Sequence, residues 1–317
     1  MSENNAQGLP PTLRHVIGQR LVVEQAEVAL AAAFQEGTPF PHALMTGPPG
    51  LGKTMLAQVI AAEMATPWQE ALGQSMTQPS ELHAFLLAAT EKAVVFIDEV
   101  DELPALVQTS LLKACEERRI YLESSQPGRA PQAVPLANFT LLMASNNEFR
   151  IVQPLRDRMK MILRFDYYSA GELGEVVRQR SRKLGWPIED EVLGLIAQRG
   201  RGTPRIALRI LESCRRVCRS IGETTITTGH FGKCCELEGI DPLGLDRSEV
   251  QLLKILHAAH GPVRLNVLSS RLGLPTRTIQ VFEEYLLRQG LLGRTPEGRQ
   301  ITTVGMEHLE RVSESKN

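Results

Sequence analysis

The chain has 317 residues and a net charge of −1, with 43% hydrophobic and 22% charged residues. Because globular domains average about 100 to 200 residues, this length predicts two or three domains that each bury a core. The composition excludes a disordered chain, and no segment approaches the roughly 18 to 20 consecutive apolar residues that a membrane-spanning helix needs.

The first segment of the chain is polar. Met1–Pro11 lacks the basic and then apolar pattern of a signal peptide. We therefore expect a short flexible tail over residues 1–12 and a protein that stays in the cytoplasm.

Residues 13–166 alternate short apolar runs with helical patterns, which is typical of an α/β domain with a parallel sheet. The candidate buried strands are 42–46, 93–97 and 139–144, and clear helical patterns cover 53–64 and 104–117. A turn-rich segment at residues 119–137 separates the second helix from the last strand. It predicts an inserted hairpin with Pro127-Gly128 in its loop.

The rest of the chain is mainly helical and divides into two predicted domains. Residues 167–240 hold helical patterns at 170–184, 190–199, 204–221 and 227–237. Residues 241–317 hold helical patterns at 246–259, 263–272 and 276–289, then a hairpin over 291–303 that turns at Pro296-Glu297-Gly298. Three helices followed by a short hairpin predict a winged helix.

The segment after the first candidate strand matches the phosphate-binding pattern GxxxxGK[ST]. Its glycines let backbone N–H groups close around phosphate oxygens, and the helix that begins at Lys53 adds the positive end of its dipole. Lys53 is expected to reach the β- and γ-phosphates, and the Thr54 hydroxyl to bind Mg²⁺. The residues expected to hold ATP are Gly47, Pro48, Pro49, Gly50, Leu51, Gly52, Lys53, Thr54 and Met55.

An acidic pair ends the second candidate strand. Asp98 is expected to lie beside the metal, and Glu99 to act as the base that orients attacking water. An exposed acidic loop is the alternative interpretation of such a pair. The presence of the phosphate loop earlier in the same chain favours the catalytic interpretation.

Further polar residues fit the same site. Asn146 follows the third candidate strand, where its amide could sense the γ-phosphate or hold the lytic water, with Ser145 and Asn147 as alternatives. Arg158 lies in a Leu-Arg-Asp-Arg motif and Arg205 in a Gly-Thr-Pro-Arg motif. An arginine that is merely exposed to solvent does not need such a motif, so both are candidates for a functional role.

Positive charge is unevenly distributed, since Arg178–Arg219 holds 11 Lys/Arg against 4 Asp/Glu. This excess fits a nucleic-acid-binding surface, and equally arginines that face bound phosphate or a neighbouring subunit. The five cysteines show no paired CxxC spacing, so neither a disulfide framework nor a zinc site is predicted. We expect reduced thiols, with Cys214 and Cys218 in the core.

In this order, the motifs resemble those of the AAA+ ATPases and, within them, the RuvB family of Holliday-junction branch-migration motors. The likeness rests on GPPGLGKT, PLRDR (Pro154–Arg158), RGTPRIALRIL (Arg201–Leu211) and GRTPEGR (Gly293–Arg299). The last two are the more specific, because many families share the phosphate loop. The resemblance covers nearly the whole chain after residue 10 and implies an AAA+ α/β domain, a helical lid and a winged helix.

The resemblance also implies roles for single residues. Arg158 would be an arginine finger inserted into the site of an adjacent subunit. Arg205, preceded by Pro204, would sense the γ-phosphate bound by its own subunit. The adenine pocket would be lined by Val16, Ile17 and Tyr168.

On the expected wing, Arg294 and Arg299 would contact DNA phosphates. Two arginines five residues apart across a turn can lie on one hairpin, which suits contact with the DNA backbone. From Asp241 to Arg311 the chain has 9 Lys/Arg and 8 Asp/Glu, so one copy should bind weakly and depend on avidity from a ring. A winged helix that contacts only proteins is the alternative.

The implied cofactors are ATP and Mg²⁺. The implied partners are DNA as duplex and four-way junction, other copies of the chain in a hexameric ring, and a RuvA-like junction-binding protein on the hairpin. The chain departs from the family's usual pattern, as a divergent member or a paralogue would. The departures are Leu9, Val100-Asp101, Ser145-Asn146-Asn147 and a hairpin rich in Ser, Gln and Pro.

The sequence therefore predicts an ATP-driven motor that moves Holliday junctions in recombination and repair. The alternative is an AAA+ switch, a loader or DNA-binding regulator without migration activity. Polar residues on the expected recognition helix, Thr276, Arg277, Thr278 and Gln280, would permit the base readout that such a regulator uses.

Overall fold

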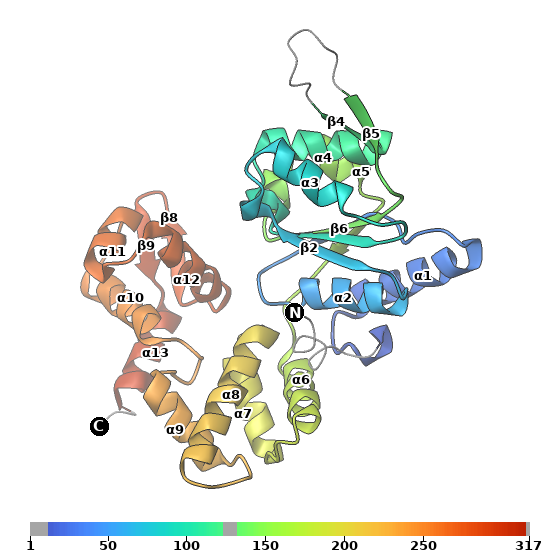
Figure 1. Cartoon of the computed structure of the whole chain (residues 1–317). Helices are drawn as coiled ribbons and strands as arrows, with labels where there is room; N and C mark the ends of the chain where they lie inside the picture. The colour runs from blue at the N-terminus through green and yellow to red at the C-terminus, as the bar shows by residue number, and fades with distance from the viewer. Residues whose placement is uncertain (1–11, 123–131, 315–317) are drawn as a thin grey trace. The chain divides into compact units, whose positions relative to one another are not determined.

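The structure, a computed structural model, describes residues 12–122 and 132–314. The chain forms two compact units, Met1–Tyr168 and Ser169–Asn317 (Figure 1). Nearly all of the predicted tail, including Leu9, and the hairpin loop with Pro127-Gly128 lie outside the described residues.

The first unit is built on a parallel sheet, as predicted. Its strand order among the described residues is β2-β3-β6-β1-β7. The strands are β1 (Ala43–Thr46), β2 (Trp68–Leu72), β3 (Val94–Asp98), β6 (Thr140–Ser145) and β7 (Met161–Arg164). Because all five run in one direction, the segments that follow them lie at one edge of the sheet.

Burial explains which strands the sequence revealed. Every residue of β1 and β6 is buried, and so are the first four of β3, so these three strands read as continuous apolar runs. The edge strands β2 and β7 are partly exposed and carry charged residues. Their apolar pattern is interrupted, and the sequence analysis missed both.

Helices cover both faces of this sheet. Figure 1 shows α1 and α2 on one face and α3, α4 and α5 on the other. Their bounds are α1 (Arg20–Glu36), α2 (Lys53–Glu63), α3 (Pro79–Leu87), α4 (Ala105–Glu117) and α5 (Gln153–Arg158). On the second face α3, α4 and α5 bury Leu82, Leu111 and Leu155 against strand residues such as Val95 and Leu141.

The inserted hairpin is present in its described part. Strands β4 (Arg119–Leu122) and β5 (Gln132–Pro135) pair antiparallel, with Ile120 opposite Val134. Ile120 is buried in the core below, whereas Tyr121 and Leu122 are exposed. The described part of the hairpin therefore exposes apolar side-chain surface.

The second unit begins with four helices: α6 (Ala170–Lys183), α7 (Asp190–Arg199), α8 (Pro204–Ser220) and α9 (Thr228–Glu238). Residue pairs that cap helix ends fix some of these starts. Ser169 and Glu172 form a capping box at α6, and proline occupies the first turn of α8. Cys214 and Cys218 are buried free thiols of α8.

The winged helix follows within the same unit. It contains α10 (Arg247–Ala258), α11 (Leu265–Leu272), α12 (Thr276–Arg288), the wing strands β8 (Leu292–Thr295) and β9 (Gly298–Ile301), and α13 (Thr303–Glu314). Helix α13 was not predicted, because Gly305 in its first turn weakens the helical pattern. Its start is marked by the Thr302 hydroxyl, which accepts the Gly305 N–H at 3.0 Å. Sheet, helical domain and winged helix together confirm the predicted fold class.

In the described ranges, no helix combines the length and the apolar character that a membrane span requires.

Candidate nucleotide site

Three loops with predicted functional residues meet at the carboxyl edge of the sheet. The phosphate loop follows β1, the acidic pair ends β3, and Asn146 follows β6. Because β6 lies between β3 and β1 in a parallel sheet, these segments are neighbours in space. Ligands of open α/β sheets bind at this edge.

Glycine is required at two positions of the phosphate loop. Gly47 has φ of 144°, and a Cβ there would lie 2.5 Å from the Phe165 carbonyl oxygen. Gly52, with φ of 98°, is the residue before α2 and turns the loop into the helix. The backbone N–H groups at the start of α2 therefore face the loop, where an anion is favoured.

The Lys53 ammonium is held inside the loop. Its Nζ donates to the Gly47 carbonyl at 2.7 Å, the Pro48 carbonyl at 2.9 Å and Asn146 Oδ1 at 2.9 Å. The residue is 7% exposed. These contacts place one positive charge between the phosphate loop and the end of β6, where the β- and γ-phosphates of a nucleotide would need it.

The Asp98 carboxylate connects the loop to the acidic pair. Thr54 Oγ1 donates to Asp98 Oδ2 at 2.8 Å, and the Glu99 N–H donates to Asp98 Oδ1 at 2.9 Å. A hydroxyl and a carboxylate oxygen at this separation form the hard oxygen donor pair that Mg²⁺ accepts. The two residues predicted to bind metal are thus brought together.

Glu99 has a strained backbone supported by a neighbouring loop. Its φ is 52°, in the left-handed region that few side chains adopt. Gly73 lies against it, since a Cβ at Gly73 would be 2.2 Å from the Glu99 carbonyl oxygen. The sequence analysis missed Gly73, because only the fold brings residues 73 and 99 together.

Among the alternatives at the end of β6, Asn146 is the residue whose amide contacts Lys53. Ser145 Oγ instead donates to Asp101 Oδ1 at 2.8 Å, and both residues are buried. Asn147 Oδ1 accepts the Phe149 N–H at 3.2 Å. Ser145 and Asn147 therefore support the loop, and Asp101 acts in the same support.

Of the three residues expected at the adenine, Tyr168 contacts the phosphate loop. The buried Tyr168 donates its hydroxyl to the Leu51 carbonyl at 3.2 Å. Val16 and Ile17 are half-buried and follow the short helix η1 (Leu13–His15). The Leu13 N–H donates to the Glu63 carboxylate, which fixes this segment to the end of α2.

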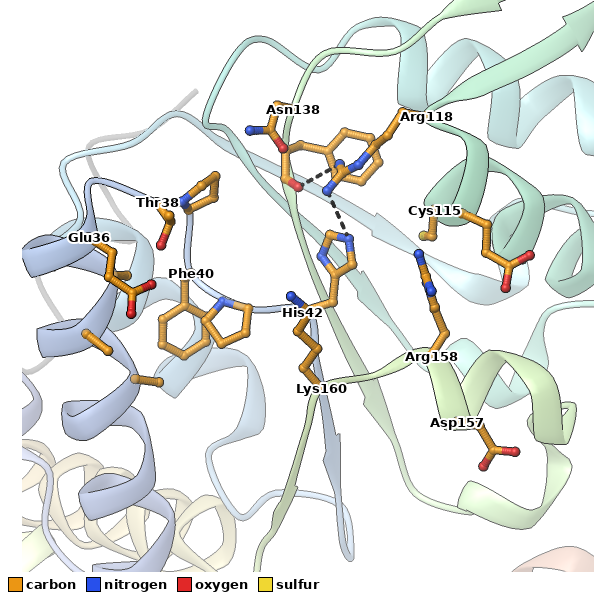
Figure 2. Close-up of a pocket in the computed structure, with 17 residues that line it drawn as sticks. Glu36, Thr38, Phe40, His42, Cys115, Arg118, Asn138, Asp157, Arg158 and Lys160 are labelled. Carbon is orange, nitrogen blue, oxygen red and sulfur yellow. Dashed lines mark hydrogen bonds between the residues drawn. The ribbon is translucent and has the colours of Figure 1, made fainter.

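Arg158 lies at the opposite edge of the sheet. It ends α5 and comes before β7, next to His42 before β1 and Phe139 before β6. These residues line a cavity of about 730 Å³. Figure 2 shows Arg158 directed into this cavity, with Asp157 pointing away. Arg158 is therefore separated from the Lys53 site of its own subunit by the length of the strands.

The same cavity depresses the basicity of a histidine. Burial, together with the positive charges of Arg118, Lys160 and Arg158, lowers the pKa of His42 to about 4. His42 Nδ1 accepts the Leu141 N–H at 2.8 Å. Arg118 is fixed nearby, since it donates to the Phe139 carbonyl at 3.1 Å and lies over the Phe139 ring.

Pro204 and Arg205 occupy the first turn of α8 in the second unit. Pro204 is half-buried and Arg205 is exposed. The buried Thr203 comes before them and donates its N–H to the Gly200 carbonyl at 2.8 Å. The guanidinium is thus carried by a well-defined turn.

The two wing arginines face each other across the hairpin, as their spacing predicts. Both pair with Glu283, whose side chain is fully buried: Arg294 Nη2 lies 2.7 Å from Glu283 Oε2, and Arg299 Nε contacts Oε1. The Arg294 side chain is 55% exposed and that of Arg299 is 19% exposed. Arg299 therefore has a structural role that the sequence did not reveal, and Arg294 is the more available to a ligand.

The part of the chain that the structure describes contains no cluster of three or more His, Cys, Asp or Glu side chains that could hold a metal.

Comparisons with known proteins cover almost the whole chain. The profile of the Holliday junction DNA helicase RuvB P-loop domain matches residues 9–165, that of the RuvB AAA lid domain matches 168–241, and that of the RuvB C-terminal winged helix domain matches 242–310.

Curated relatives and solved structures agree with these profiles. The chain is 36% identical to Holliday junction branch migration complex subunit RuvB 2 of Synechococcus sp. (strain JA-3-3Ab), over 96% of this chain and 84% of the relative. It is 35% identical to the RuvB subunit of Thermotoga maritima, over 95% of this chain and 91% of the relative. The solved structure titled Thermotoga maritima RuvB Holliday junction branch migration motor matches with a TM-score of 0.84 and 34% identity, over 96% of this chain and 98% of the other.

Proposed function

The chain belongs to the RuvB family of Holliday junction DNA helicases, and we propose that it is an ATP-driven motor that moves four-way DNA junctions. One observation carries this proposal. The phosphate loop, the acidic pair and Asn146 meet at one edge of the sheet, where they would hold a nucleotide, while Arg158 lies at the other edge.

The hydrolytic chemistry follows from the contacts at the carboxyl edge. Lys53 and the loop N–H groups would bind the phosphates, and Thr54 and Asp98 would hold Mg²⁺, which neutralises charge on the phosphate oxygens. Glu99 accepts a proton from the attacking water, and Asn146 orients that water against the γ-phosphate.

The position of Arg158 supports assembly. A strand of four residues spans about 13 Å at about 3.3 Å per residue, so Arg158 lies well away from its own Lys53 site. Its guanidinium would instead enter the site of the next subunit, where such a finger contributes about 10³ to 10⁵ in rate. Repetition of one such head-to-tail contact gives a ring when its rotation closes, and we place the chain in a hexameric ring around duplex DNA.

The winged helix supplies the DNA contact. The half-exposed Arg294 would bind a backbone phosphate, and the balanced charge of this domain makes each contact weak. Branch migration exchanges equivalent base pairs, so ATP supplies direction more than net energy. Because the substrate is DNA, we place the protein in the cytoplasm.

The second partner would be a RuvA-like junction-binding protein. Tyr121 and Leu122 expose apolar surface on the hairpin and are the described residues best placed to dock it. Such a protein would hold the junction while rings act on its arms.

The test is the ATP hydrolysis rate without DNA, with linear duplex and with a four-way junction, in the parent and in Glu99→Gln. We expect DNA to stimulate hydrolysis by the parent, and Glu99→Gln to bind ATP with turnover reduced by about 10² to 10⁴. Indifference of the parent to every DNA would contradict the motor and favour an ATP-dependent switch.

A further inference from the structure

The turn between α7 and α8 comes directly before Pro204 and Arg205 and has an unfavourable backbone conformation. Arg201 has φ of 55° and Gly202 has φ of 75°, both in the left-handed region. A residue with a side chain seldom adopts this region, because its Cβ comes too close to the following carbonyl oxygen. The conformation persists only where surrounding contacts fix it.

Those contacts come from the winged helix, through the Arg201 guanidinium. Arg201 Nε donates to the Gly244 carbonyl at 2.8 Å, and Nη1 donates to Glu249 Oε1 at 2.8 Å. Nη2 contacts both of these partners as well. The side chains are 13% and 3% exposed, so this is a buried bidentate ion pair.

Helix α12 closes the other side of this guanidinium. Arg201 lies 4.5 Å from the centre of the Tyr285 ring, and the Tyr285 hydroxyl donates to the Leu243 carbonyl at 2.8 Å. Arg288 Nη2 donates to the Arg201 carbonyl at 2.5 Å. Both the side chain and the backbone of Arg201 are therefore bound to the winged helix.

Close backbone packing adds to these contacts. A Cβ at Gly244 would lie 2.7 Å from the Arg199 carbonyl oxygen at the end of α7. Glu249 also accepts the Asp246 N–H at 2.9 Å in the capping box of α10. The turn before Arg205 and the start of the winged helix therefore behave as one rigid piece.

We propose that Arg201 is a positioning residue that couples the nucleotide sensed by Arg205 to the winged helix that binds DNA. This inference rests on the proposed function, which gives Arg205 its sensing role. Three residues separate the two arginines, and a buried ion pair contributes little net stability compared with apolar packing. What the pair does supply is a fixed geometry between the sensor turn and α10.

The test measures the coupling between the two ligands. The affinity of the full-length protein for a fluorescent linear duplex is measured at one salt concentration, with saturating ADP and with a slowly hydrolysed ATP analogue. We expect the parent's two affinities to differ by about 5- to 150-fold, the usual range of coupling between sites. In Arg201→Ala the ratio of the two DNA affinities should fall to within about twofold of one. The affinity of this variant for the ATP analogue should stay within about threefold of the parent's.

Two further variants keep the result interpretable. Arg288→Ala, at an exposed position, removes the bond to the Arg201 carbonyl and should reduce the ratio while the fold persists. Arg216→Ala removes the exposed ion pair with Glu238 on the neighbouring helices and should leave the ratio unchanged.

An unchanged ratio in folded Arg201→Ala and Arg288→Ala would overturn the inference. A parent with a ratio of one would instead contradict the proposed function, and the coupling with it.

Discussion

At the scale of single residues, the catalytic geometry depends on side chains and on the backbone that holds them. The Glu99 carboxylate is carried by a left-handed residue pressed against Gly73. Lys53 is fixed by two loop carbonyls and the Asn146 amide. Small displacements at such positions are costly, since a shift of about 1 Å can reduce turnover about 10²-fold.

Gly73→Ala should therefore slow catalysis without touching the nucleotide loop. The added Cβ would meet the Glu99 carbonyl oxygen at 2.2 Å and displace the base. We expect kcat to fall about 10- to 100-fold with ATP affinity little changed. Gly174→Ala is the matched control, because a Cβ there meets nothing within 4 Å in helix α6. Normal turnover in Gly73→Ala would show that this contact does not position Glu99.

The neutral His42 makes stability depend on pH. Its pKa falls from 6.5 in the unfolded chain to about 4 in the folded protein, so the unfolded state binds the proton more tightly. The contribution of neutral His42 to the free energy of unfolding is fully present above about pH 6.5. It is lost as pH falls toward 4, and the loss amounts to about 3 kcal/mol at most.

The check is chemical denaturation of the parent and of His42→Asn, which retains an acceptor for the Leu141 N–H, between pH 4 and 7. The parent should lose more stability than the variant across this interval. An equal loss of stability in the parent and in His42→Asn would contradict the lowered pKa of His42.

At the scale of elements, contiguous patterns were predictable and contacts across the fold were not. The phosphate loop, the buried strands β1, β3 and β6, and the capped helices lie within short stretches of sequence, and each was predicted. The edge strands β2 and β7 were missed because exposure interrupts their apolar pattern. The contacts of Gly73 with Glu99 and of Glu283 with the wing join segments that only the fold brings together.

The wing gives a prediction that separates two arginines of equal charge. Arg299→Ala removes the more buried of the two partners of Glu283 and leaves one buried carboxylate oxygen without a donor, which should destabilise the winged helix by about 1 to 3 kcal/mol. Arg294→Ala should lower DNA affinity and reduce the salt slope of binding by about one, with a small effect on stability. Thermal unfolding and DNA titrations at several salt concentrations measure both. Equal loss of stability in the two variants would contradict this division of roles.

At the scale of the whole molecule, the phosphate loop and Arg158, the proposed finger, lie at opposite edges of one sheet. The sequence could give the motif of each, whereas their separation required the strand order β2-β3-β6-β1-β7. That separation makes each copy incomplete on its own. Hydrolysis is therefore expected to be a property of the assembly.

Mixed assemblies test this directly. Arg158→Ala and Lys53→Ala should each be nearly inactive alone, because one lacks the finger and the other lacks the phosphate contact. When the two are mixed, some interfaces join an intact loop to an intact finger, and part of the hydrolysis should return. Arg156→Ala, two residues away on α5, is the control for local disruption of the helix. Normal hydrolysis by Arg158→Ala alone would show that Arg158 is not the finger.

In the proposed function, ATP hydrolysis moves a four-way junction. The most direct measurement is strand separation of a synthetic junction by the parent and by Glu99→Gln, with ATP or ADP, and with or without the cognate RuvA-like protein. We expect junctions to separate into duplexes only with the parent, ATP and the partner together. Resolution that proceeds equally with ADP or with Glu99→Gln would contradict it, and so would an intact junction under every condition despite ATP hydrolysis stimulated by DNA.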